Sequence, residues 1–353
     1  MELTFTILTV VVFLICVLPI FNWSHWTIRS MDFPRLQLAV LFTCVFVGQL
    51  SQLEPNDSRS IIRLLTLLAC ILWQLWWVLP FSPLWKKEVH SSKNEEPTNT
   101  IKVITANVLT TNRKSHKLID LVKEYQPDVL VTLESDQWWQ DQLDCLEDDL
   151  PYTVKCPLDN LYGMHVYSRF ELLDAELNYL VQDGVPSVEA TLKLTNGQLV
   201  KAYFLHPAPP SPTENEESTE RDAELVIVAR KIAKDDSPTI VTGDLNDVAW
   251  SKTTRLFRKI SGLLDPRVGR GMFNTFHANY WFMRWPLDHM FHSEHFTVRQ
   301  IKRLPNIGSD HFSLYTELQY SPKLKSTQEG LDIEKGDKHE AKEIIQKEQI
   351  KNA

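Results

Sequence analysis

Three long apolar runs open the chain, and polar sequence follows them. Thr4–Phe21, Leu36–Leu50 and Leu64–Phe81 contain no charged residue. As helices, all three are close to the shortest length that crosses ~30 Å of hydrocarbon. Buried helices of a soluble protein are the alternative. Three such runs joined by short polar loops instead favour a membrane anchor over residues 1–88, with spans at about 4–21, 36–52 and 64–81.

The flanks of these runs favour membrane spans over a cleaved leader. No basic residue precedes the first run, and no small-residue cleavage pattern follows it. Tryptophans gather near the ends of the first and third runs, as in the aromatic belts of membrane interfaces; they are Trp23, Trp26, Trp73, Trp76, Trp77 and Trp85. We therefore predict a multi-pass protein of the cell membrane, with the lipid bilayer as a partner.

The charges beside the spans bear on which side of the membrane the main domain lies. With three spans, residues 22–35 lie on the same side as everything after residue 85. That side carries more basic residues than the other, so the positive-inside rule favours a cytoplasmic main domain; they are Arg29, Arg35, Lys86, Lys87 and Lys93, against Arg59 and Arg63. Cys145 and Cys156 are either isolated thiols or a disulfide, and a disulfide would need an oxidising compartment. Both sides stay open.

After a polar linker over 89–100, the pattern changes to that of an α/β domain over 101–319. Ile101–Val108 and Val129–Leu133 predict strands, and Lys114–Tyr125 has helical spacing between them. Further strands are predicted at Gly163–Ser168, Ser187–Leu194, Leu199–His206, Thr239–Thr242 and Phe312–Leu318, with a helix at about Arg221–Lys234. Asn196-Gly197 indicates a hairpin between two of them. Residues 320–353 are rich in Lys, Glu and Gln, and we predict a disordered or loosely helical tail outside the fold.

The net charge of the chain limits the classes of partner that it can bind. The net charge of −8 argues against a general nucleic-acid binder, which usually has a basic footprint. One basic run, however, follows the strand at Thr239–Thr242; it comprises Lys252, Arg255, Arg258 and Lys259, with Arg267, Arg270 and Arg284 beyond. Such a run is usually a solvated helix face, and attraction of an anion is the alternative.

Polar residues recur where the predicted strands begin or end. They are Asn107, Glu134, His206, Asp244, Asn246, Asp288, Asp310 and His311. Singly, each has an ordinary explanation, such as a turn former, a helix cap or an ion-pair partner. Carboxylates at strand ends are costly to bury unless they bind something. Clustered oxygens beside a histidine suit a hard cation such as Mg²⁺ and a phosphoryl oxygen.

The order of these residues resembles the endonuclease/exonuclease/phosphatase superfamily over about 101–319. The motifs are Thr105-Ala106-Asn107-Val108, Pro127 to Glu134, Gly163 to Arg169, Leu205-His206-Pro207, Gly243-Asp244-Leu245-Asn246, Leu287-Asp288 and Ser309-Asp310-His311. The departures are Ala106, where an aromatic residue is common, and Leu133, where Gln is usual. His206 stands where apurinic endonucleases have Tyr. With its N-terminal spans, the chain is similar to bacterial membrane-anchored members of the teicoplanin-resistance type, whose catalytic domain lies outside the cytoplasm.

The resemblance implies a four-layer αββα sandwich, as in deoxyribonuclease I, and hydrolysis of a phosphoester. It implies Asn107, Glu134 and Asp310 in the shell of Mg²⁺, with Mn²⁺ as an alternative. It implies that Asp244 orients or deprotonates the attacking water and that Asn246 holds the same water or a phosphoryl oxygen. His311, fixed by Asp288, would donate to phosphate. His206 would stabilise charge or protonate the leaving group.

Three functions remain in view. The first is a membrane-anchored, Mg²⁺-dependent phosphoester hydrolase that acts on a lipid-linked or membrane-proximal phosphate. The second is a Mg²⁺-dependent nuclease, which the acidic balance disfavours. The third is a non-catalytic membrane scaffold that keeps the fold, although the chain retains every acid and histidine that the chemistry needs.

Overall fold

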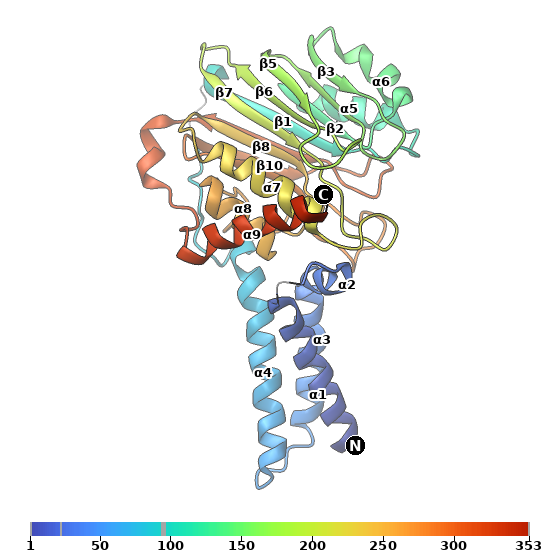
Figure 1. The fold of residues 1–353 in the computed structure, drawn as a ribbon, viewed down its shortest axis with the longest axis vertical. Coiled ribbons are helices and arrows are strands. Elements are labelled where there is room, and N and C mark those ends of the chain that lie inside the picture. The colour runs from blue at the N-terminus through green and yellow to red at the C-terminus, as the bar shows by residue number, and fades with distance from the viewer. Residues whose placement is uncertain (1, 22, 93–96, 352–353) are drawn as a thin grey trace.

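The structure, a computed structural model, describes residues 2–21, 23–92 and 97–351. A stalk of N-terminal helices carries a larger α/β domain, as Figure 1 shows. The chain enters the stalk at its far end and finishes on the surface of the α/β domain. The stalk and the main domain therefore form one elongated molecule.

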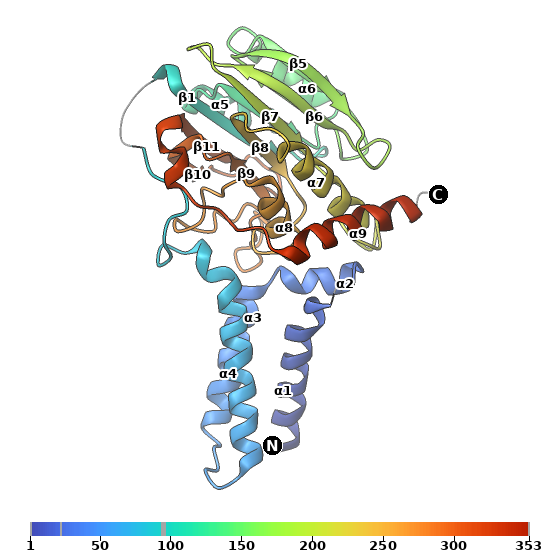
Figure 2. The ribbon, with the colours of Figure 1, turned by 60° about the vertical axis from the view of Figure 1, so that its left-hand side comes forward.

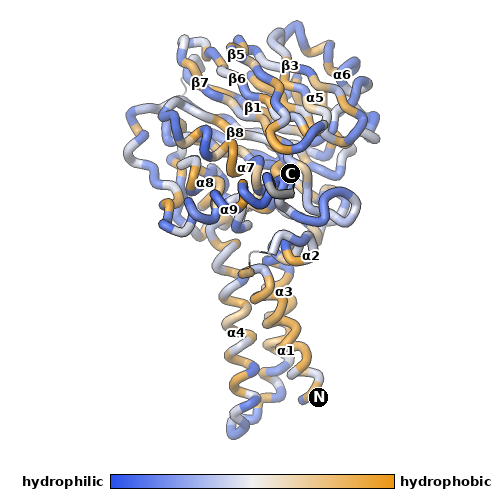
Figure 3. The backbone as a smooth tube through the Cα atoms, viewed as in Figure 1, coloured by the Kyte–Doolittle hydropathy of each residue, from blue (hydrophilic) through white to orange (hydrophobic). Residues whose placement is uncertain are grey.

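The stalk consists of α1 (Glu2–Val17), α3 (Arg35–Leu50) and α4 (Ser58–Val78). Two segments, Glu2–Ile20 and Ser58–Phe81, are long and apolar enough to cross a membrane. The third candidate is a pair of helical segments, Trp26–Asp32 and Arg35–Leu50, bent by 76°. The stalk is mostly hydrophobic in Figure 3, and many of its large apolar side chains are exposed. An apolar surface of this kind fits contact with lipid rather than with water.

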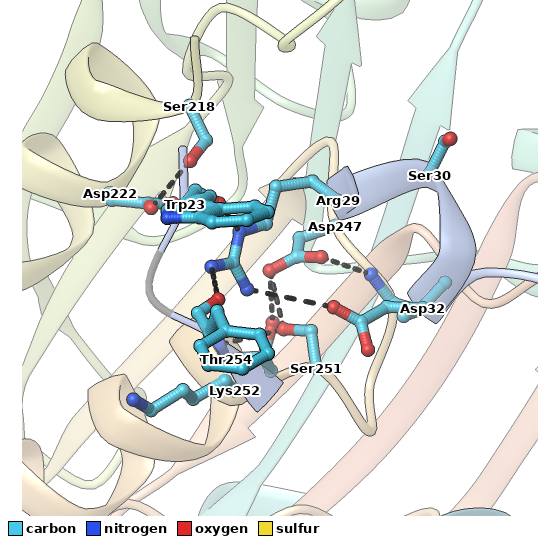
Figure 4. A network of polar contacts seen from close by, with 12 residues as sticks. Trp23, Arg29, Ser30, Asp32, Ser218, Asp222, Asp247, Ser251, Lys252 and Thr254 are labelled. Atoms are coloured by element: carbon cyan, nitrogen blue, oxygen red, sulfur yellow. Dashed lines mark hydrogen bonds and ion pairs between the residues drawn. The ribbon is translucent and has the colours of Figure 1, made fainter. Parts of the chain in front are cut away.

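A bent elbow joins the first and second stalk helices and contacts the α/β domain. It contains α2 (Trp26–Arg29) and a 3₁₀ turn, Ser30–Asp32. The Asp32 carboxylate pairs with Arg29 at 3.8 Å and with Arg35, and the Asp32 carbonyl accepts from the Trp250 indole at 2.8 Å. Figure 4 shows Arg29 and Asp32 beside Asp247 of the main domain. Buried polar contacts therefore fix the stalk against the domain.

The α/β domain contains two β-sheets. The first has the order β10-β11-β1-β2-β4-β3, and the second has the order β5-β6-β7-β8-β9. Only the pairs β1/β2 and β7/β8 are parallel among the strand pairs of the described residues. The strands are β1 (Thr100–Asn107), β2 (Val129–Leu133), β3 (Tyr152–Cys156), β4 (Met164–Ser168), β5 (Glu171–Asn178), β6 (Ser187–Lys193), β7 (Leu199–Leu205), β8 (Thr239–Asp244), β9 (Asp288–His292), β10 (Phe296–Arg303) and β11 (Leu314–Tyr320).

The sheets pack face to face, and helices cover their outer faces. Val103 and Val131 of the first sheet share a buried core with Ala202 and Ile240 of the second. Helices α5 (Ser115–Tyr125) and α6 (Gln137–Leu143) pack outside the first sheet, and α7 (Thr219–Ile232) and α8 (Lys252–Ser261) outside the second. Figure 2 shows these helices from a second direction. The predicted four-layer αββα sandwich is confirmed.

Close packing of β7 and β8 explains the glycine in the Gly243-Asp244-Leu245-Asn246 motif, which begins near the end of β8. Gly243 has φ of 153°, and a Cβ there would lie 1.8 Å from the carbonyl oxygen of Leu205. No other residue fits without moving the strands apart. The next residue, Asp244, is thereby held at the end of β8, directly beside the end of β7.

Two expectations about the surface were wrong. The basic run is not a solvated face, because Arg258 and Arg267 are fully buried and pair with Glu88 and Asp265. The tail does not lie outside the fold, because Lys335–Lys351 forms α9, which packs on the domain. Its Ala341 is buried against α7 and α8, with Ile344 and Ile345 packed alongside. These three apolar residues have helical spacing, and the polar composition of the segment as a whole obscured that pattern.

Other expectations concern the cysteines and the linker. Cys145 and Cys156 are free thiols. The predicted linker at 89–100 falls partly on residues 93–96, which lie outside the described residues. Its first residue, Val89, is fully buried in the core between the sheets. The domain limits of 101 and 319 stay predictions.

Candidate active site

The strand ends bring together polar residues that are far apart in the sequence. Asn107 ends β1, Glu134 follows β2, and Asp244 ends β8. The Asn107 amide donates to Glu134 Oε1 at 2.7 Å and to Asp244 Oδ2 at 3.2 Å. One side chain of the first sheet thus joins a carboxylate of its own sheet to a carboxylate of the other.

A histidine–carboxylate group lies on the other side of Asp244. His311 Nδ1 lies 2.8 Å from Asp288 Oδ2, and His311 Nε2 lies 3.4 Å from Asp244 Oδ2. Burial alone would lower the pKa of His311, but the two carboxylates outweigh it and raise this pKa to about 10. The two carboxylates therefore favour the protonated ring, whose Nδ1–H donates to Asp288.

The buried carboxylates Glu134 and Asp244 are short of positive charge. Burial raises the pKa of Glu134 to about 7, and Asn107 opposes it only in part. Asp310 is close enough to add to the rise. Burial also raises the pKa of Asp244, against the pull of His311. Each shift means that the anionic form lacks a counter-charge at this place.

This shortage is the reason why a divalent cation fits. Glu134 Oε2 is buried and has no hydrogen-bond partner among the described residues. Asp310 offers a further carboxylate of the kind that Mg²⁺ and Mn²⁺ take. Asn107 instead turns its NH2 group toward the carboxylates, and its Oδ1 accepts from Leu109 N at 3.1 Å. Asp244, Asp288 and His311 also have ligand atoms within 4.8 Å of one another. Asp288 already bonds His311 Nδ1, whereas Glu134 Oε2 has no partner among the described residues, so the Glu134 side has the freer ligand atom.

His206 and Asn246 complete the set that the sequence predicted. His206 follows β7 and is buried, and burial lowers its pKa to about 4, so the ring is neutral. Its Nδ1 has no partner among the described residues, and its ring lies 5.4 Å from that of Tyr162. Asn246 N donates to Asp244 Oδ1 at 2.9 Å, and its amide donates to the Pro207 carbonyl at 2.9 Å. Asn246 therefore links the ends of β7 and β8.

Two of these residues adopt an unusual backbone conformation. Glu134 has φ of 57° and Asn246 has φ of 51°. Left-handed backbone is common for Asn and rare for Glu, where it costs roughly 1–3 kcal/mol. Such strain is concentrated at functional sites. The position of Glu134 therefore needs more support from its surroundings than that of Asn246.

Several supporting residues carry no signal in the sequence. Thr275 Oγ1 accepts from the backbone N–H of Asp288 at 3.2 Å, and the Phe276 ring lies 4.9 Å from the His311 ring. Arg221 is fully buried, pairs with Asp222, and donates to the Asn246 carbonyl at 2.9 Å. The first two belong to an aperiodic segment, and Arg221 resembles any helix-surface arginine. Only the tertiary structure reveals them.

A comparison with family sequence models decides the relationship. The model of the Endonuclease/Exonuclease/phosphatase family matches residues 104–311, more than half of the chain. The chain belongs to this family. Family membership confirms the prediction of a metal-dependent phosphoester hydrolase, of the phosphatase, phosphodiesterase or endonuclease kind. No curated protein sequence matches the chain.

Solved structures of family members share the fold. Humanized D. rerio TDP2 has a TM-score of 0.53 at 17% identity and covers 63% of this chain, with 99% of its own length matched. The human Nocturnin catalytic domain has a TM-score of 0.52 at 19% identity, covering 63% and 95%. A family protein from Bacteroides thetaiotaomicron has a TM-score of 0.52 at 16% identity, covering 64% and 97%. At these identities the likeness establishes the sandwich fold alone.

Proposed function

We propose that this family member is a membrane-anchored, Mg²⁺-dependent hydrolase of a lipid-linked or membrane-proximal phosphoester. One observation carries the membrane part. Two aromatic rings connect the site to the stalk: Phe276 lies 4.9 Å from His311 and 6.2 Å from Trp285, and Trp285 lies 5.8 Å from Phe33. Phe33 stands between the elbow and α3. The site is therefore at the end of the domain that bears the anchor.

The residues divide into a metal side and a proton side. Glu134, Asp310 and Asn107 would hold the cation, which when bound polarises the phosphoryl group and offsets its developing charge. Asp244 would orient the attacking water and accept its proton, a positioned-base effect worth ~10²–10⁴-fold. Asn246, fixed by Pro207 and Arg221, would hold the same water or a phosphoryl oxygen.

The histidines would act on the phosphate from the other side. Asp288 fixes the His311 ring through Nδ1, which leaves Nε2 to donate to a phosphoryl oxygen when substrate displaces its contact with Asp244. The neutral His206, whose Nδ1 is unpaired among the described residues, would stabilise charge as the leaving group departs. Proximity to the bilayer would raise the effective concentration of substrates there.

Full-length protein in lipid nanodiscs with Mg²⁺ tests the proposal. It should release phosphate or a phosphomonoester from at least one class of a panel that includes lipid phosphoesters, nucleotides and DNA. Glu134→Gln should abolish the release, whereas Glu176→Gln, at an exposed position on β5, should not. Inactivity toward every class, together with no Mg²⁺ binding that depends on Glu134 and Asp310, would instead favour the scaffold.

The nuclease alternative has one supporting observation. D. rerio TDP2 complexed with a single-strand DNA product shares the fold, with a TM-score of 0.53 at 18% identity. The net charge of −8 weakens the case, because DNA binding draws on basic surface. The DNA arm of the panel separates the two enzymes: cleavage of DNA in preference to every lipid phosphoester would establish a nuclease.

A reporter fused after Gln319 determines the side of the membrane. Two of the basic residues that favour a cytoplasmic domain, Arg29 and Arg35, are buried and paired with Asp32. Because these two arginines are needed for the elbow itself, they are weaker evidence for a cytoplasmic domain. An external domain, as in the bacterial members that the chain resembles, therefore becomes the stronger prediction.

A further inference from the structure

An exposed aromatic loop projects from the domain beside the site. We call residues 277–284, between α8 and β9, the aromatic loop. Four consecutive apolar side chains lie at its tip: Tyr280 is 50% exposed, Trp281 81%, Phe282 53% and Met283 41%. A run of this kind is unfavourable in water unless it has a partner.

The loop has a defined shape. His277 N donates to the Met283 carbonyl at 3.0 Å, and Met283 N donates to the Tyr280 carbonyl at 3.3 Å. Below these contacts, Phe276 N donates to the Trp285 carbonyl at 3.0 Å. Backbone pairing therefore closes the loop at its root, and the aromatic tip is held outward by the rest of the loop.

The tip is located at the stalk. The Gln37 side chain, in the first turn of α3, donates to the Phe282 carbonyl at 3.0 Å. Other exposed apolar residues occur at the same end of the stalk helices, where an interfacial belt belongs; they are Trp23, Trp76, Leu84 and Trp85, between 37% and 87% exposed. The aromatic loop continues this belt.

The root of the loop is bound to the site residues. Ala278 N donates to the Asp310 carbonyl at 2.6 Å, and Phe276 both bridges to His311 and packs against its ring. Two arginines, Arg284 and Arg303, lie over the Phe312 ring at 5.1 and 4.4 Å, directly after His311. The loop thus joins the candidate interface to the candidate site through a few residues, and it is flanked by cationic charge.

We propose that the aromatic loop inserts into the interfacial layer of the bilayer that holds the stalk and presents lipid-linked phosphoesters to the site. The lipid occupant follows from continuity with the stalk and from tryptophan and tyrosine at the tip, which prefer the headgroup level. Arg284 and Arg303 suit the anionic headgroup of such a substrate. The substrate part rests on the proposed function as a whole, whereas insertion rests only on its membrane anchor and not on its catalysis.

Fluorescence quenching tests insertion without any assay of activity. Full-length protein is reconstituted in phosphatidylcholine nanodiscs with and without brominated acyl chains. The emission that Trp281→Leu removes should be quenched by bromine. The emission that Trp138→Leu removes should not, because Trp138 is on α6, far from the stalk (Figure 1). Equal quenching of the two components, or a nanodisc particle with two copies joined through Trp281, overturns the proposal.

A ratio of activities tests presentation. Once a substrate is known, wild type and Trp281→Ala/Phe282→Ala are compared on a lipid phosphoester in phosphatidylcholine vesicles and on bis(4-nitrophenyl) phosphate in solution. The variant should lose about tenfold on vesicles, equivalent to 1.4 kcal/mol, and keep the rate in solution and the thermal midpoint. Equal loss on both substrates overturns presentation. Wild type that shows the expected quenching but hydrolyses no class of the substrate panel overturns the proposed function alone.

Discussion

The domain buries two neighbouring clusters of charged side chains, and they differ in how fully their polar atoms are paired. In the first, the Arg267 cluster, Asp265 accepts three hydrogen bonds from Arg267, and Arg267 also bonds His289 and the Asp288 carbonyl. Every side-chain nitrogen and oxygen of Asp265, Arg267 and His289 has a partner. Residue 288, the neighbour of His289, belongs to the second cluster, the site.

The site also combines carboxylates with histidines, but it leaves polar atoms unpaired. Glu134 Oε2, His206 Nδ1 and Asp288 Oδ1 are buried without a hydrogen-bond partner among the described residues. The pKa shifts agree: burial would raise the pKa of Asp265, but Arg267 outweighs it and lowers this pKa, whereas the pKa of Glu134 rises. A closed cluster supports the fold, and an open one is prepared for a ligand.

The largest expected effect is on catalysis at the open cluster. Asp244→Asn removes the base and keeps the shape, so the rate of phosphoester hydrolysis should fall by ~10²–10⁴-fold. The free energy of unfolding should hold or rise, because a buried carboxylate of raised pKa is removed. Initial rates and denaturant titration of the nanodisc-bound protein measure both. A large loss of stability would place Asp244 with the closed cluster instead.

The next effect is on stability at the closed cluster. Arg267→Leu leaves the Asp265 carboxylate buried without its partner, which should destabilise the domain by roughly 3–5 kcal/mol. The double variant Arg267→Leu/Asp265→Leu should recover much of the loss, because the charges are removed together. Denaturant midpoints of both variants check this. A single variant as stable as wild type would show that the Arg267 cluster is not closed by this pair.

Mg²⁺ should stabilise the folded protein through the open cluster and not through the closed one, by less than the loss expected for Arg267→Leu. At a hundred times its dissociation constant, a cation bound only to the folded state stabilises by about 2.7 kcal/mol. Glu134→Gln should abolish the Mg²⁺-dependent rise in the thermal midpoint. Asp265→Asn should lower the midpoint without abolishing that rise. The opposite pattern would move the metal to the closed cluster.

His165 tests whether an unpaired group always marks the site. It is fully buried on β4, neither ring nitrogen has a partner among the described residues, and burial lowers its pKa to about 4. Between pH 4 and 6.5 only the unfolded chain binds this proton, so stability falls as pH falls through that window. The loss at pH 5 should be about 1–2 kcal/mol.

His165→Phe should flatten that pH dependence and leave hydrolysis unchanged, whereas His116→Phe, at an exposed position on α5, should change neither. Stability measured against pH supplies the slope, and initial rates supply the activity. Loss of activity in His165→Phe would mean that unpaired polar atoms extend the functional site to β4.

Local pattern was enough to predict the strands β1, β2 and β8 and the polar residues at their ends, but not β9, which begins at Asp288. Asn107, Glu134 and Asp244 each follow an apolar strand, and parallel pairing of β1 with β2 and of β7 with β8 makes such ends converge. The aromatic loop and Thr275 belong to a segment without periodicity, so no pattern placed them. Arg258 and Arg267 were expected on a solvated face, because their burial with Glu88 and Asp265 arises only from tertiary packing.

The junction of α4 with the domain has a consequence for how substrates are found. The 3₁₀ turn Leu79–Phe81 runs from the stalk straight into buried contacts: Phe81 packs against Trp250 at 5.9 Å, and Gly269 N donates to the Pro80 carbonyl at 2.8 Å. In a membrane, this mounting would hold the site at a constant height and tilt. The enzyme and a lipid-linked substrate would then meet by lateral diffusion. Only substrates whose phosphate lies at the height of the site above the bilayer would be hydrolysed.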